Sequence, residues 1–148
     1  MSVHYPHEIR ELLLKLNLFR GLDEAELTLL LAQAELVDVG TGDYPIREGD
    51  RGQHLFVLLA GSARISKRSF GIQKVIQDLK PGECFGEMSL IECRPRSASV
   101  KAMSACKLLK IDGEHIAQVP STAAKLYRNI ATLLSQRLRH ANDILTLG

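Results

Sequence analysis

The middle of the chain consists of short segments, several of them rich in valine and isoleucine, that are separated by turn signals. The segments include LFVLLAG, SARISKR, QKVIQDL and CKLLKID, and the turn signals include Glu48-Gly49-Asp50 and Pro81-Gly82. Many short strands at this spacing are typical of a sandwich or a jelly-roll barrel. Such a barrel must close on itself to hide its strand edges. The sequence therefore predicts a mainly β fold over residues 34–111.

The first 33 residues show helical periodicity instead. Apolar residues recur at the spacing of one helix face in HEIRELLLKLNLF. A second helix is expected to begin after Asp23, because Glu26 follows three residues later in the position of a capping box. Residues 1–33 are therefore expected to form N-terminal helices.

Helix is expected again over residues 112–148. Asp112 is a good N-cap for a short helix that Pro120 ends, and Ser121 is the expected cap of a long last helix. The apolar residues of this last helix alternate by four and three, as in a coiled-coil seam: Tyr127, Ala131, Leu134, Leu138, Ala141 and Leu145. The seam predicts a homodimer through the C-terminal helix. A helix that packs wholly against its own domain is the alternative.

The composition is that of a soluble globular protein with one domain, residues 1–148. The chain has 148 residues, of which 45% are hydrophobic and 24% are charged, and its formal net charge is +2. This charge gives no strong attraction to nucleic acid or to an anionic membrane. No apolar run has the length of a membrane span. The three cysteines form no CxxC pair, so we expect reduced thiols and a cytoplasmic protein.

One segment inside the strand-rich region, GECFGEMSLIECRPRSASV, contains the candidate site. GEMSLIE is the one short helical candidate there, and the first N–H groups of such a helix attract an anion. Gly86 allows the backbone to approach that anion closely. The planar guanidinium of Arg96 can return across the same hollow, and it suits two phosphate oxygens. A phosphate is therefore the expected guest.

Glu87 fits this site only if it binds something other than the phosphate, because two anions repel each other. A ribose 2′-hydroxyl can donate to a carboxylate, as it does in dinucleotide-binding folds. A phosphate and a free 2′-hydroxyl within one small ligand describe a 3′,5′-cyclic ribonucleotide. Met88 and Ser89 would offer backbone amides to the phosphate, and Ser97 would offer a hydroxyl.

The stretch FGEMSLIECRPRSASV resembles the phosphate-binding cassette of cyclic nucleotide-binding domains, which reads F-G-E, a short helix, and R-[STA]-A before an apolar strand. LFRGLDEAELTLLLA and GDYPIREGDRGQHLFVLLAGSARI are similar to the N-terminal helices and early strands of that family. The resemblance covers nearly the whole chain. It implies an eight-stranded β-roll, or jelly roll, with N-terminal helices and C-terminal hinge and lid helices. Catabolite-activator-type regulators and kinase regulatory subunits have this architecture.

The resemblance also implies a role for each cassette residue. Glu87 would take the ribose 2′-hydroxyl and Arg96 the cyclic phosphate. The other ligand-binding residues would be Phe85, Gly86, Met88, Ser89, Ser97 and Ala98. Ser97 in place of threonine follows the commoner cyclic AMP form of the family. It favours cyclic AMP over cyclic GMP as the ligand, and no other cofactor is expected.

Two features depart from the family pattern. Pro45 lies where the family has an apolar strand residue, and it removes a ladder donor, so an edge or a bulge is expected there. The sequence ends at Gly148 with no helix-turn-helix, kinase or channel segment. Direct DNA binding by these residues is therefore not expected, and the protein effector is unknown.

The remaining candidate residues have ordinary structural explanations. The five histidines form no H-x-H or H-E-x-x-H pattern, and no Ser-His-Asp or paired-carboxylate set occurs, so neither a metal site nor a catalytic residue is expected. Cys84 and Cys93 suit buried apolar positions beside the short helix. A basic stretch of the last helix suits a solvated face, although one of its members is able to reach over the base as a lid: Arg128, Arg137, Arg139 and His140.

Taken together, these features predict a non-catalytic cyclic nucleotide sensor in which ligand binding rearranges the C-terminal helices. Two alternatives stay open. One is a constitutive dimerisation or scaffold β-roll with a vestigial pocket. The other is the sensor half of a transcription regulator whose DNA-binding part lies outside these residues.

Overall fold

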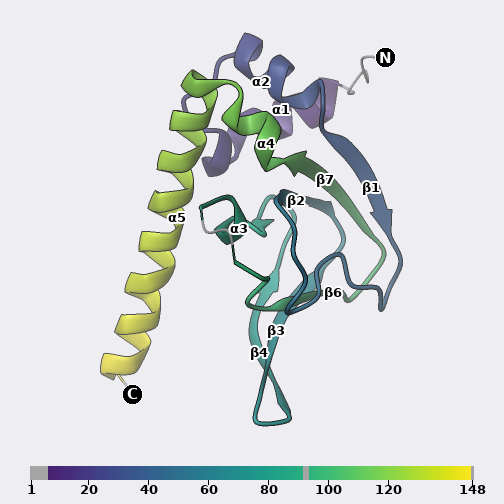
Figure 1. Cartoon of the computed structure of the whole chain (residues 1–148), viewed down its shortest axis with the longest axis vertical. Coiled ribbons are helices and arrows are strands. Elements are labelled where there is room, and N and C mark those ends of the chain that lie inside the picture. Colours follow the sequence, from purple (N-terminus) through teal and green to yellow (C-terminus); the bar gives the residue numbers. More distant parts are fainter. Residues whose placement is uncertain (1–6, 92–93, 148) are drawn as a thin grey trace.

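The computed structural model describes residues 7–91 and 94–147 and shows a β-roll with helices at both ends of the chain (Figure 1). A short helix, α3 (Met88–Ile91), interrupts the strands. The flanking helices are α1 (His7–Lys15), the 3₁₀ helix η1 (Asn17–Phe19), α2 (Glu24–Leu31), α4 (Gly113–Ala117) and α5 (Pro120–Leu147). The predicted mainly β fold with flanking helices is confirmed.

The strands of the described residues form two antiparallel sheets. The first has the order β1-β7-β2-β5 and the second has the order β4-β3-β6. The bounds are β1 Glu35–Val39, β2 His54–Ala60, β3 Ala63–Ser69, β4 Ile72–Leu79, β5 Cys84–Phe85, β6 Ser99–Ala102 and β7 Cys106–Asp112.

These seven strands are one fewer than the eight that the family resemblance implies. The segment around Pro45 forms a single bridge, between Ile46 and Val100, in place of a strand. Proline has no N–H to donate to a ladder, so regular pairing does not continue through it. The irregular edge expected at Pro45 is therefore present.

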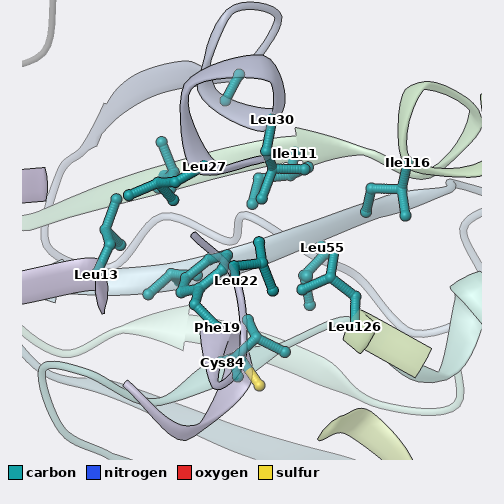
Figure 2. Packing of buried hydrophobic residues seen from close by; sticks show 14 of the residues in the cluster. Leu13, Phe19, Leu22, Leu27, Leu30, Leu55, Cys84, Ile111, Ile116 and Leu126 are labelled. Carbon is teal, nitrogen blue, oxygen red and sulfur yellow. The ribbon is translucent and has the colours of Figure 1, made fainter. Parts of the chain in front are cut away.

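Strand β2 separates two hydrophobic cores, because alternate side chains of a strand point to opposite faces. Leu55 and Val57 belong to a cluster beneath the helices (Figure 2), where they meet Leu13, Phe19, Leu27, Ile111, Ile116 and Leu126. Phe56 and Leu58 belong to a second cluster that both sheets share, with Ile46, Ala63, Leu79, Phe85, Val100 and Leu108. Burial on both faces explains the unbroken apolar run at the centre of β2.

Polar side chains fix the helix starts largely as expected. Asp23 and Glu26 form the predicted capping box at the start of α2, and Asp112 accepts from the N–H of Glu114 at the start of α4. The expected Ser121 cap of α5 is wrong, because α5 begins at Pro120. Proline suits the first helical position, where no N–H is needed.

The predicted seam of α5 is divided between two environments. Leu126 and Ile130 are fully buried in the core beneath the helices, and the seam residues Tyr127 and Leu134 pack partly against the same core. Farther along, Leu138 is 63% exposed. The side chain of the last seam residue, at position 145, lies outside the described part of the chain. The first half of α5 is therefore docked on its own domain, and the homodimer stays a prediction.

Candidate functional site

A cavity of about 1420 Å³ lies between the cassette segment and α5. Its walls include the end of α1, η1, the loop before β5 and residues 133–141 of α5. Figure 1 shows α3 on the side of the roll that faces α5. The predicted site residues that line this one cavity are Phe85, Gly86, Glu87, Met88, Arg96, Ser97 and Ala98. The side chain of the remaining predicted residue, Ser89, lies outside the described part of the structure.

Arg96 is held in place by hydrogen bonds of both its backbone and its guanidinium. Its N–H donates to the Asp50 carbonyl at 2.7 Å, and its carbonyl accepts from the Gly49 N–H at 2.8 Å. Its Nη1 donates to the Gly86 carbonyl and its Nη2 to the His54 carbonyl, each at 3.0 Å. A guanidinium has about five N–H donors in a planar fork. Two backbone carbonyls can therefore orient it without using all of its donors.

Two glycines make room for this guanidinium. Gly86 has a φ of +81°, and a Cβ placed there would lie 2.9 Å from Arg96 Nη1 and 2.9 Å from the His54 carbonyl oxygen. A Cβ at Gly52 would lie 3.2 Å from Arg96 Nη2. The sequence predicts that Gly86 admits an anion. The structure shows that Gly86 also admits the arginine that is expected to bind this anion.

Glu87 is a buried acid whose partner comes from α5. The residue is 5% exposed. Nη1 of Arg137 donates to Oε1 of Glu87, and Nη2 of Arg137 donates to the Cys84 carbonyl at 3.3 Å. A buried carboxylate without such a partner would be costly in a low dielectric. This ion pair joins the cassette to the last helix.

The other cassette residues shape the wall of the cavity. Phe85 is buried in the core of the roll, where its ring stacks on that of Phe56 with 5.1 Å between centroids. It therefore supports the cassette mainly by packing. Met88 and Ser97 are exposed, and Ala98 is half-buried.

Helix α3 is a smaller source of positive potential than the sequence suggests. It has four residues, so few aligned peptide dipoles sum at its amino end. The positive charge in the cassette wall therefore comes mainly from arginine side chains, since Arg94 and Arg96 both line the cavity.

Burial shifts the pKa of two groups at the site. Burial lowers the pKa of Arg96, and the nearby Glu87 partly opposes this shift. Arginine titrates so far above neutrality that Arg96 stays charged at physiological pH. Burial, helped by Glu87, raises the pKa of the Cys84 thiol to about 12. The expected buried position of Cys84 is confirmed, whereas Cys93 lies outside the described residues.

Three parts of the site have no motif that marks them in the sequence. Gly52 and His54 reach Arg96 only through the fold, because His54 precedes it by 42 residues. The interpretation of Arg137 as part of a solvated face is wrong, since it pairs with Glu87. A usable signal was its spacing from Ile130 and Leu133, which places all three on one helix face.

Neither a metal centre nor a membrane span is found in residues 7–91 and 94–147. No group of three or more His, Cys, Asp or Glu side chains there could hold a metal ion. No helix in these ranges combines the length and the apolar character needed to cross a bilayer.

Residues 36–122 match the model of a protein family described as the cyclic nucleotide-binding domain. The cyclic AMP receptor protein of Thermus thermophilus is 34% identical over 126 residues, which cover 84% of this chain and 58% of that protein. The CRP-like cAMP-activated global transcriptional regulator of Mycobacterium tuberculosis is 24% identical over 134 residues, which cover 90% of this chain and 60% of that protein. The chain thus spans about 60% of the length of these regulators.

Solved structures agree with this match. The catabolite activator protein of Thermus thermophilus has a TM-score of 0.78 and 33% identity, over 88% of this chain and 62% of that one. A cyclic nucleotide-binding domain from Methylobacillus flagellatus has a TM-score of 0.81 and 26% identity, over 94% of this chain and 81% of that one. Since the family model covers more than half of the sequence, this chain belongs to the cyclic nucleotide-binding domain family.

Proposed function

We propose that the chain is a non-catalytic sensor that binds a cyclic nucleotide in the cavity and transmits binding to α5. The observation that carries this proposal is that Glu87 and Arg96 line one cavity. Arg96 offers a guanidinium to the cyclic phosphate, and Glu87 offers a carboxylate to the ribose 2′-hydroxyl. The remaining contacts come from the cassette residues Phe85, Gly86, Met88, Ser89, Ser97 and Ala98.

Cyclic AMP is the ligand that we favour. Relatives named for cyclic AMP and relatives named for cyclic GMP both match the chain, so the relatives do not decide between the two. The preference rests on Ser97, which follows the cyclic AMP form of the cassette.

Helix α5 is the candidate output element. It lines the cavity through residues 133–141 and also carries the exposed part of the predicted dimer seam. If such a helix can take two positions, a ligand shifts the equilibrium between them only as far as its affinities for the two positions differ. Ligand binding would therefore change the geometry of a homodimer, or expose a face of α5 to a protein effector.

Residues 1–148 would act as one sensor domain. The bacterial regulators that match the chain are longer, and the chain spans about 60% of them. A DNA-binding function would accordingly belong to a segment outside these residues. Cys84 and Cys106 are unpaired thiols, the state that cysteines keep in the reducing cytoplasm, so we place the sensor there.

Calorimetric titration of the purified chain with cyclic AMP and cyclic GMP tests the proposal. Arg96→Ala is expected to cost on the order of 2–5 kcal/mol of affinity, as does removal of one partner of a buried charge pair. Arg68→Ala is the matched control, because exposed Arg68 on β3 does not line the cavity. Unchanged affinity in Arg96→Ala refutes the site. No heat with either nucleotide favours the scaffold alternative.

A further inference from the structure

A second cavity, of about 580 Å³, lies outside the cassette, where α5 meets the N-terminal helices. Figure 1 shows this part of α5 beside those helices. The walls come from η1, from the turn that follows η1 and from residues 125–136 of α5. Its volume is that of an ordinary small-molecule site, about 300–1000 Å³. None of the residues predicted to bind the cyclic nucleotide lines it, so the proposed function does not account for this second cavity.

The wall of the second cavity is strongly basic. Its cationic side chains are Arg20, Lys125 and Arg128, and no carboxylate of the described residues lines it. Lys125 is paired at 2.5 Å with Glu26 of α2, outside the wall. The guanidinium groups of Arg20 and Arg128 have no hydrogen-bond or ion-pair partner within residues 7–91 and 94–147. Two positive charges without a partner therefore line one hollow.

Hydrogen bonds within the wall occupy backbone oxygens that would otherwise repel an anion. The side-chain amide of Asn129 donates to the carbonyl of Leu18 at 2.7 Å and to that of Arg20 at 2.9 Å. The hydroxyl of Thr132 donates to the carbonyl of Arg128 at 3.0 Å. The same bonds to Leu18 and Arg20 fix the turn after η1 against α5. An anion in the second cavity would therefore meet two guanidinium groups held on neighbouring elements.

We propose that the second cavity binds a small molecule that carries a phosphate monoester or a pyrophosphate group. The planar fork of a guanidinium suits two oxygens of one phosphate. Arg20 and Arg128 together match a group with two or more negative charges better than a cyclic phosphate, which carries one. Such a ligand would bridge the turn after η1 and α5. The inference goes beyond the proposed function and does not depend on it.

Calorimetric titration of the purified chain with inorganic pyrophosphate tests the inference, at an ionic strength held constant with sodium chloride. The wild type is expected to bind it, and the double variant Arg20→Gln, Arg128→Gln is expected to lose at least about tenfold in affinity, as for the loss of one hydrogen bond to a charged group. Arg139→Gln is the matched control, because exposed Arg139 lies on the same helix and lines neither cavity. Its affinity should not change.

Arg96 lines the first cavity and could attract the same probe, so the two sites must be separated. Arg96→Ala is expected to lose affinity for cyclic AMP and to keep its affinity for pyrophosphate. The double variant is expected to show the opposite pattern. Pyrophosphate should also bind to wild type that is saturated with cyclic AMP. If the chain binds no cyclic nucleotide, the proposed function fails, and the pyrophosphate titration still decides the second site.

Nuclear magnetic resonance locates the probe on the wild type, so this test stands even if the double variant does not fold. Pyrophosphate should shift the amide signals of residues 20–21 and 125–136 more than those of 84–98. Three outcomes overturn the inference: no binding of pyrophosphate, an equal loss of affinity in Arg139→Gln and the double variant, or displacement of pyrophosphate by cyclic AMP. The first two make the arginines ordinary solvated charges, and the third places the probe in the first cavity.

Discussion

Replacement of Gly86 by alanine tests whether the phosphate side of the site depends on the position of Arg96. The new Cβ would lie 2.9 Å from Arg96 Nη1, 2.9 Å from the His54 carbonyl oxygen and 3.2 Å from Ile46 Cδ1. The φ of +81° adds backbone strain, which costs about 1–2 kcal/mol for a residue with a Cβ. The His54 oxygen belongs to the backbone of β2 and cannot easily move. Arg96 is therefore the group that we expect to be displaced.

Displacement of Arg96 removes a charge-assisted contact to the phosphate, worth about 1.5–3 kcal/mol. The affinity for cyclic AMP should accordingly fall about tenfold to hundredfold. Gly71→Ala is a closely matched control. Gly71 has a φ of +76°, but nothing lies within 4 Å of a Cβ placed there. The control thus introduces similar strain without crowding.

Denaturant unfolding and calorimetry separate the two effects. Both variants should lose stability through strain, by about 1–2 kcal/mol in Gly71→Ala and by more in Gly86→Ala, whereas only Gly86→Ala should lose affinity. If Gly86→Ala binds cyclic AMP as tightly as Gly71→Ala does, the ligand does not depend on the observed position of the guanidinium. The account of the phosphate subsite would then be wrong.

Three further predictions concern stability. Leu126→Ala should lower the free energy of unfolding by about 2–5 kcal/mol, measured with denaturant, because Leu126 is fully buried where α5 docks. The raised pKa of Cys84 means that its stabilising contribution is present below pH 9 and is lost as pH rises toward about 12. Wild type should therefore lose stability more steeply than Cys84→Ala in denaturant unfolding across that range. Lys125 lowers the pKa of Glu26, so the contribution of this carboxylate is present above the ordinary pKa of glutamate and is lost as pH falls below it. Acid unfolding of Glu26→Gln should show a shallower pH dependence than that of the wild type.

The β-roll and its flanking helices follow from local signals, since turn residues and strand periodicity act over a few positions. The number of strands does not follow in the same way. Pairing of the segment at Ile46 with Val100 is a long-range event, and the proline beside Ile46 limits how far that pairing extends. The predicted start of α5 was wrong for a different, local reason. A serine that can cap a helix and a proline that suits its first position are neighbours in the sequence, and either can mark the start of the helix.

The sequence motif contains the side chains that are expected to bind the ligand, but the groups that position these side chains come from other parts of the fold. Glu87 and Arg96 stand in one short motif, whose residue types already point to a phosphate and a hydroxyl. The carbonyl of His54 and the space at Gly52 reach Arg96 through the loop and strand that precede the motif. No rule of local periodicity predicts these contacts, because they depend on the path of the backbone.

The phosphate subsite and the ribose subsite are held by different parts of the chain. A ligand can therefore bind in the cavity without acting on α5. Arg96 is positioned by backbone groups of the segment 49–54 and of Gly86, none of which belongs to α5. Glu87, in contrast, is held by Arg137 of α5. A ligand with a cyclic phosphate but no 2′-hydroxyl would thus find its phosphate contacts intact and would make no contact with the carboxylate that α5 shares. We therefore expect 2′-deoxy cyclic AMP to bind in the cavity without strengthening the contact between α5 and Glu87.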